Sequence, residues 1–121
     1  MTWNQLYNFR QMLEELLIES SSTQRDISQK LKKTIWSCAD ENDRGSLESE
    51  RTLLIAQADW TGRLIRDIKE SLKLMDRGEF GVCALCGEEI NPRRMLVYPT
   101  ARYCAQCQEI LESEESIMSF R

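Results

Sequence analysis

Histidine is absent from this chain of 121 residues, which contains only two prolines and five glycines. The lack of histidine removes the commonest general base and a frequent ligand of catalytic metals. No apolar run approaches the length of a membrane span, and the first residues do not resemble a targeting sequence. We therefore expect a cytoplasmic protein that is not an enzyme.

Basic residues are also fewer than acidic residues, 16 against 20, so the formal net charge is -4. The acidic residues are concentrated in two segments. Residues 39–50 contain five acidic residues and one basic residue, Arg44, and the tail from residue 108 is also acidic. An acidic protein without a dominant basic patch is a poor candidate for sequence-specific nucleic-acid binding. A protein partner is the better expectation.

Four of the five cysteines form two C-x2-C pairs, Cys83 with Cys86 and Cys104 with Cys107, separated by seventeen residues. This spacing is typical of a four-cysteine zinc site. Two disulfides and unligated thiols are the alternatives, but nothing at the start of the chain indicates an oxidising compartment. A closed four-sulfur shell leaves no coordination position for a substrate. The motif therefore predicts one structural Zn²⁺.

Two long segments carry apolar residues at helical spacing. The first, from about Asn4 to Cys38, contains no proline or glycine, and its apolar positions are Leu6, Phe9, Leu13, Leu16, Leu17, Ile27, Leu31 and Ile35. The second follows a heptad pattern through Leu47, Leu54, Ala58, Thr61, Ile65, Ile68, Leu72 and Met75. Between them, residues 40–46 are rich in turn-forming Asp, Asn and Gly. Two striped helices joined by a short turn predict an antiparallel hairpin.

Weak points interrupt both helices. The polar run from Ser20 to Thr23 forms helix poorly, and Gly62 costs about 1 kcal/mol in a helix interior. Cys38, beside the turn, is either a small apolar residue that closes the seam or a redox-sensitive thiol. Tertiary packing must therefore stabilise the hairpin.

The last third of the chain is expected to form a small module around the cysteines. Gly78 and Gly81 end the second helix, Met95, Leu96 and Val97 are predicted to form a short strand, and an amphipathic helix follows Cys107. The predicted fold class is mainly α, with a long antiparallel coiled-coil hairpin on a four-cysteine zinc-finger module that ends in a C-terminal helix. We place the boundary between residues 1–77 and 78–121.

Five basic residues share one side of the second helix: Arg63, Arg66, Lys69, Lys73 and Arg77. They indicate either a docking stripe for an acidic partner or an ordinary solvated face, which is the more common meaning of such a pattern.

The cysteine motif has a specific setting, which runs from Gly78-Glu79-Phe80-Gly81-Val82 through Arg93-Arg94 and Pro99-Thr100-Ala101 to Cys107. Together with Asp40-x-x-Asp43-Arg44 at the predicted turn, it resembles the DksA/TraR family of bacterial RNA-polymerase regulators, over nearly the whole chain. The resemblance implies a monomer that inserts its hairpin into the secondary channel of RNA polymerase. It also implies that Asp40 and Asp43 are effector residues supported by Arg44.

The chain departs from the family pattern in two places. Gly45 replaces the usual alanine after the arginine, which is expected to loosen the turn. Well-studied members bind the alarmone ppGpp jointly with polymerase through basic residues, but three of those positions correspond here to Asp67, Tyr98 and Gln108. An acid and two neutral groups are unsuited to anchoring a polyphosphate. We therefore expect little or no dependence on ppGpp.

Without this resemblance, the preferred hypothesis would be a zinc-ribbon scaffold whose coiled coil pairs with another chain. That scaffold would be a dimer, whereas a hairpin that pairs with itself would be a monomer. An enzymatic role has the least support, because Asp40 and Asp43 form an exposed pair on a turn without evidence of an enclosing pocket.

Overall fold

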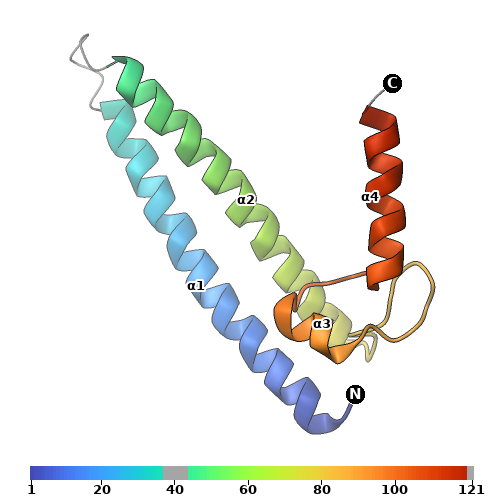
Figure 1. Ribbon diagram of the computed structural model, residues 1–121. Coiled ribbons are helices and arrows are strands. Elements are labelled where there is room, and N and C mark those ends of the chain that lie inside the picture. Colours follow the sequence, from blue (N-terminus) through green and yellow to red (C-terminus); the bar gives the residue numbers. More distant parts are fainter. Residues whose placement is uncertain (37–43, 120–121) are drawn as a thin grey trace. The chain divides into compact units, whose positions relative to one another are not determined.

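The computed structural model describes the backbone of residues 1–36 and 44–119, and the side chains of residues 1–34 and 48–115. The described backbone forms four helices (Figure 1): α1 (Trp3–Trp36), α2 (Arg44–Asp76), α3 (Pro92–Val97) and α4 (Ala105–Ser119). Within the described residues, the only extended pairing is one antiparallel bridge between Val82 and Glu89. The mainly α fold is confirmed. None of the described helices is long and apolar enough to span a membrane.

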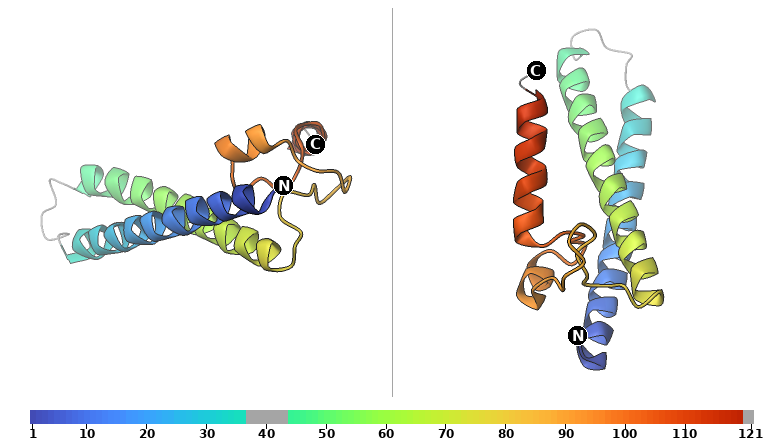
Figure 2. Two further views of the ribbon diagram at one scale, coloured as in Figure 1. Left: turned by 90° about the horizontal axis from the view of Figure 1, so that it is seen from below. Right: turned by 90° about the vertical axis from the view of Figure 1, so that its right-hand side faces the viewer.

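The chain divides into two compact units, residues 14–69 and residues 1–13 with 70–121. The first unit is the greater part of the hairpin, in which α1 and α2 lie side by side and run in opposite directions (Figures 1 and 2). The second unit combines the start of α1 and the end of α2 with α3, α4 and the four cysteines.

The hairpin seam follows the predicted heptad spacing. On α2, Leu54, Thr61 and Ile68 are buried and seven residues apart. On α1, the buried positions of this unit are also seven apart: Ser20, Ile27 and Thr34. The pattern of large apolar residues did not predict Ser20 and Thr34 as seam positions. Their small side chains suit a close helix contact, and the Thr34 hydroxyl donates to the Leu31 carbonyl at 2.7 Å.

The layer of the seam that contains Gln24 and Gly62 is polar and has space for an added methyl group. A Cβ atom added at Gly62 would lie 3.8 Å from Nε2 of Gln24, which is an ordinary van der Waals contact. The neighbouring Oε1 of Gln24 is buried without a hydrogen-bond partner. Since a buried, unsatisfied acceptor and a helical glycine both weaken packing, this layer is a weak point of the hairpin.

The second unit has a core of its own. Leu13 of α1 and Ile90 and Met95 of the cysteine module are fully buried in it. The ring of Phe9 packs against that of Phe80, with centroids 5.7 Å apart. Arg10 donates to Asp76 across α1 and α2 at 2.7 Å. The ends of both hairpin helices therefore share a core with the cysteine module.

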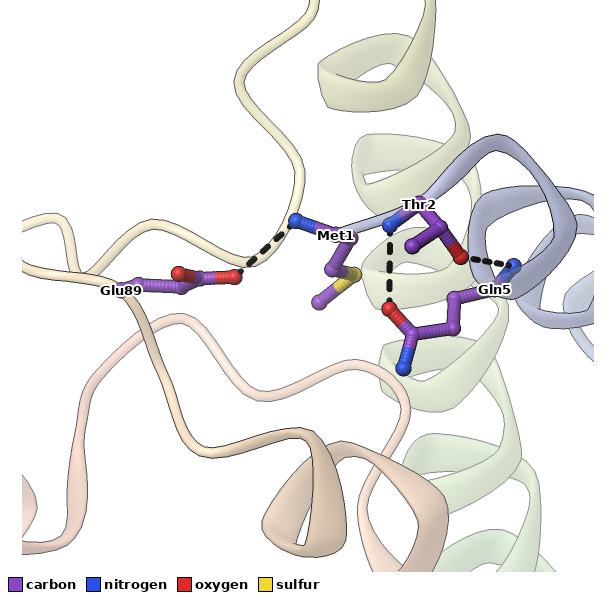
Figure 3. A network of polar contacts seen from close by, with 4 residues as sticks. All are labelled: Met1, Thr2, Gln5 and Glu89. Atoms are coloured by element: carbon purple, nitrogen blue, oxygen red, sulfur yellow. Dashed lines mark hydrogen bonds and ion pairs between the residues drawn. The ribbon is translucent and has the colours of Figure 1, made fainter.

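The first residue adds a further link within this unit (Figure 3). The ammonium group of Met1 pairs with Oε1 of Glu89 at 3.2 Å, and its side chain lies against Gly81. Thr2 and Gln5 then exchange hydrogen bonds that cap the start of α1, at 3.0 and 3.2 Å. These contacts attach the first turn of α1 to the cysteine module.

The predicted strand at Met95–Val97 is wrong, because these residues form the second half of α3. Asn91 is the N-cap, and its side chain accepts a hydrogen bond from the Arg93 amide at 3.0 Å. Pro92 occupies the first turn, where its missing N–H has no cost. The dipeptide Asn91-Pro92, which we interpreted as a turn, is therefore a helix start.

Replacing Gly62 with alanine is expected to stabilise the hairpin. The added methyl group fits beside Gln24, and alanine favours helix over glycine by roughly 0.5–1 kcal/mol. Equilibrium urea unfolding, followed by circular dichroism at 222 nm, should show a higher midpoint. Gly78→Ala is the matched control with the opposite expected sign, because Gly78 has a φ of 74°. A lower midpoint for Gly62→Ala would show that the layer is already tightly packed.

Candidate functional site

The first cysteine pair lies on a tight backbone turn. The amide of Cys83 donates to the Glu88 carbonyl at 2.8 Å, and the amide of Gly87 donates to the Cys83 carbonyl at 3.0 Å. Gly87 has a φ of 77°, in the left-handed region that favours glycine. The turn therefore holds the side chains of Cys83 and Cys86 close together.

The second cysteine pair lies at the start of α4. Cys104 immediately precedes the helix, and Cys107 lies in its first turn. The amide of Gln108 donates to the Cys104 carbonyl at 2.9 Å, which continues the helical pattern back to the ligand. A hydrogen bond of 2.8 Å from the Ala84 amide to the Arg102 carbonyl joins the two pairs.

The four sulfur atoms form a compact cluster that fits a zinc ion. All four Sγ atoms lie within 4.8 Å of one another, and those of Cys86 and Cys104 are 3.9 Å apart. A tetrahedral zinc site with Zn–S bonds of about 2.3 Å requires sulfur separations of about 3.8 Å. No disulfide joins these four cysteines in the structure, and their arrangement favours the zinc site over two disulfides.

The thiols also affect one another's protonation. Burial raises the pKa of Cys83, but backbone donors from Cys86, Cys104 and Leu85 outweigh this effect and lower the pKa to about 6. The side chain of Cys104, together with burial, raises the pKa of Cys107 to about 12. Four thiolates at this distance therefore need a nearby cation to be ionised together, and Zn²⁺ supplies that charge.

The structure places the predicted basic stripe along α2 and the residue that follows it, Arg77. The five residues are all exposed: Arg63, Arg66, Lys69, Lys73 and Arg77. Arg63 forms an ion pair with Asp59 of the same helix at 2.8 Å. A docking role for the stripe stays a prediction.

The predicted effector residues Asp40 and Asp43 lie outside the described residues, as does Cys38. Arg44 and Gly45 are the first two residues of α2, so the backbone at Gly45 is helical rather than part of the turn. The effect of Gly45 on the preceding turn stays a prediction, because that turn lies outside the described residues. Their roles at a hairpin tip stay predictions.

Both parts of the chain match known protein families. Residues 5–75 match the model of the N-terminal domain of the DnaK suppressor protein DksA, and residues 78–113 match the prokaryotic dksA/traR C4-type zinc finger. The chain belongs to the DksA/TraR family. The cysteine cluster is accordingly a C4-type zinc finger that suits one structural zinc ion.

Curated relatives are similar over most of their length. The "RNA polymerase-binding transcription factor DksA" of Haemophilus influenzae is 32% identical over 119 residues, which are 95% of this chain and 79% of the relative. The protein of the same name from Escherichia coli K12 is 30% identical over 122 residues, which are 95% of this chain and 76% of the relative.

A solved structure has a similar fold. The transcription factor DksA2 from Pseudomonas aeruginosa superposes with a TM-score of 0.86 at 29% identity, and the match covers 96% of this chain and 89% of that one. The similarity supports the predicted combination of a coiled-coil hairpin and a zinc-finger module.

Replacing Cys104 with serine is expected to abolish stoichiometric zinc binding and to destabilise the second unit. The free energy of structural zinc binding is also folding free energy, on the order of 10 kcal/mol in zinc-finger peptides. Zinc content by atomic emission should fall from one ion per chain to well below one, and thermal unfolding should begin at a lower temperature.

Cys38→Ser serves as the control for this experiment, because Cys38 is outside the predicted quartet, and it should keep one zinc ion. Full zinc content and unchanged thermal unfolding in Cys104→Ser would contradict the four-sulfur site.

Proposed function

We propose that this chain is a bacterial transcription regulator that binds RNA polymerase directly in the cytoplasm. The observation that carries the proposal is the pair of family matches, which together span residues 5–75 and 78–113. Relatives that match over 95% of the chain bear the name RNA polymerase-binding transcription factor. This role requires no catalysis and no sequence-specific contact with nucleic acid.

In the proposed mechanism, the hairpin tip enters the secondary channel of the polymerase and changes the stability of the open promoter complex. A helix of 34 residues, such as α1, extends about 50 Å at 1.5 Å per residue. An element of this length can carry a charged turn into a channel that is too narrow for a globular domain. The zinc finger then has a structural role.

Asp40 and Asp43 are the proposed effector residues. Their carboxylates would interact with metal ions or basic groups near the catalytic centre of the polymerase, where low water content leaves charges poorly screened. Arg44 would support them. The basic stripe on α2 would contribute contacts with acidic surfaces at the entrance of the channel.

The alternative is a scaffold whose helices pair with a second chain. The hairpin argues against it, because α1 and α2 already bury their heptad positions Ile27, Leu54 and Ile68 within one chain. We therefore propose that the protein acts as a monomer.

Replacing Asp40 and Asp43 together with asparagine is expected to remove the effect on transcription while polymerase binding and zinc content are retained. The substitutions delete charge but keep side-chain size. Transcription with purified polymerase from a ribosomal-RNA promoter measures the effect, and co-sedimentation measures binding.

Glu48→Gln with Glu50→Gln is the matched control, because it removes two exposed acidic charges from α2. It should retain full activity. An active Asp40→Asn, Asp43→Asn protein would refute the role of the tip carboxylates.

The proposed function includes weak or absent dependence on ppGpp. Tyr98 and Gln108 offer no positive charge, and the side-chain Nε2 of Gln108 already donates to Oε1 of Glu112 at 3.1 Å. Asp67 would repel a polyphosphate. In the purified transcription system, ppGpp should therefore change the effect of this protein less than about twofold.

A variant with Asp67→Lys, Tyr98→Arg and Gln108→Lys provides the comparison and should gain a response to ppGpp. Strong amplification of the native protein's effect by ppGpp would contradict this expectation.

A further inference from the structure

The middle of the hairpin carries small and polar residues on both helices, which lie side by side in Figure 1. Ser20 lies one turn before Gln24 on α1, and Thr61 immediately precedes Gly62 on α2. Ser20 and Thr61 are both buried. All four residues belong to the compact unit of residues 14–69. We call them the central polar layer: Ser20, Gln24, Thr61 and Gly62.

The contact between the helices is weak at this layer. Oε1 of Gln24 is buried without a hydrogen-bond partner, which is unfavourable because the carbonyl has lost its contact with water. Gly62 has no side chain to pack against α1, and even an added Cβ would only reach Nε2 of Gln24 at 3.8 Å. Few attractive contacts therefore oppose a change in the distance or tilt of the two helices here.

Each helix also has a local weakness at the same level. On α1, the run from Ser20 to Thr23 has low helix propensity. The Thr23 hydroxyl donates to the Glu19 carbonyl at 3.0 Å, a contact one turn back that often bends helices because it competes with the backbone bond. On α2, Gly62 lowers the helix propensity. Both helices can therefore bend where their mutual contact is weakest.

Buried apolar residues flank the layer along the seam. Ile27 and Leu54 are 5% and 6% exposed, and Ile68 is fully buried. Since these contacts are stronger than those of the layer, local opening of the layer requires less free energy than unfolding of the whole hairpin. The layer therefore separates two better packed stretches of the same unit.

We propose that the central polar layer is a hinge, at which α1 and α2 bend and transiently lose contact. The stretch that contains Ile27 and Leu54 moves as one piece, because its own seam contacts persist. The hinge is a property of the free chain. Its use rests on the proposed function, in which bending adjusts the direction of Asp40 and Asp43 inside the polymerase channel.

Amide hydrogen exchange, measured by NMR on the zinc-loaded full chain without polymerase, tests the hinge itself. After correction for intrinsic exchange rates, the amides of Gln24 and Gly62 should exchange about tenfold faster or more than amides on either side along the same helix. The reference amides are those of Leu17 and Leu31 on α1 and of Leu54 and Ile68 on α2. The expected signature is a local maximum in the exchange rate at the layer.

Gly62→Ala tests whether the two helices open together. Alanine strengthens α2 and fits beside Gln24. The exchange of the Gln24 amide, on the other helix, should therefore slow by roughly two- to fivefold, the factor that corresponds to the difference in helix propensity. Thr52→Ala is the matched control, because it also raises the helix propensity of α2 and removes only an exposed hydroxyl that donates to the Glu48 carbonyl. It should leave the exchange rate of Gln24 unchanged.

The combined variant Gln24→Leu, Gly62→Ala tests the use of the hinge. It replaces the unpaired amide with an apolar side chain and adds a methyl group, so the midpoint of urea unfolding should rise. Its effect on transcription by purified polymerase should nevertheless fall by about threefold or more, because the stiffened hairpin no longer adjusts its direction. Thr52→Ala should keep the full effect. A layer with only a structural role would give higher stability without loss of the effect.

The outcomes separate the hinge from the proposed function. Exchange rates that rise steadily toward the helix ends, without a local maximum at Gln24 and Gly62, would overturn the hinge. Unchanged exchange of Gln24 in Gly62→Ala would also overturn it. Full transcriptional effect of the stiffened double variant would refute the use of the hinge in the channel. If the native chain has no effect on transcription, the proposed function fails, and the exchange rates still decide whether the hinge exists.

Discussion

The fold of the second unit depends on the convergence of four thiolates within 4.8 Å of one another. The cysteine turns are too short to bury a core alone, and their sulfur atoms repel when ionised, so a cation is needed to hold them. Around this cluster, Ile90 and Met95 are fully buried, and Phe80 reaches the ring of Phe9 on α1. Loss of zinc is therefore expected to loosen the start of α1 and the end of α2 as well as the cysteine turns.

The proposed effector residues Asp40 and Asp43 are not part of this cluster. Zinc with four cysteine ligands offers no open position, so its contribution is structural. The hairpin contributes length, and its seam combines Leu54, Ile68 and Ile27 with small polar residues that permit close helix packing.

Much of the fold follows from local patterns in the sequence. Heptad spacing predicted the buried positions Leu54, Thr61 and Ile68, and the two C-x2-C pairs predicted the sulfur cluster. The error at Met95–Val97 arose because three apolar residues were weighed above the helix-start signal of Asn91-Pro92. The contact between Phe9 and Phe80 joins segments that are distant in the sequence, and no local pattern predicts such a pairing.

The most direct test of the central claim is a cryo-electron microscopy structure of the zinc-loaded chain bound to purified RNA polymerase. The proposed function predicts density for α1 and α2 inside the secondary channel, with the segment that contains Asp40 and Asp43 beside the catalytic centre. A complex in which that segment lies in solvent, while another part of the chain contacts the polymerase, would contradict it.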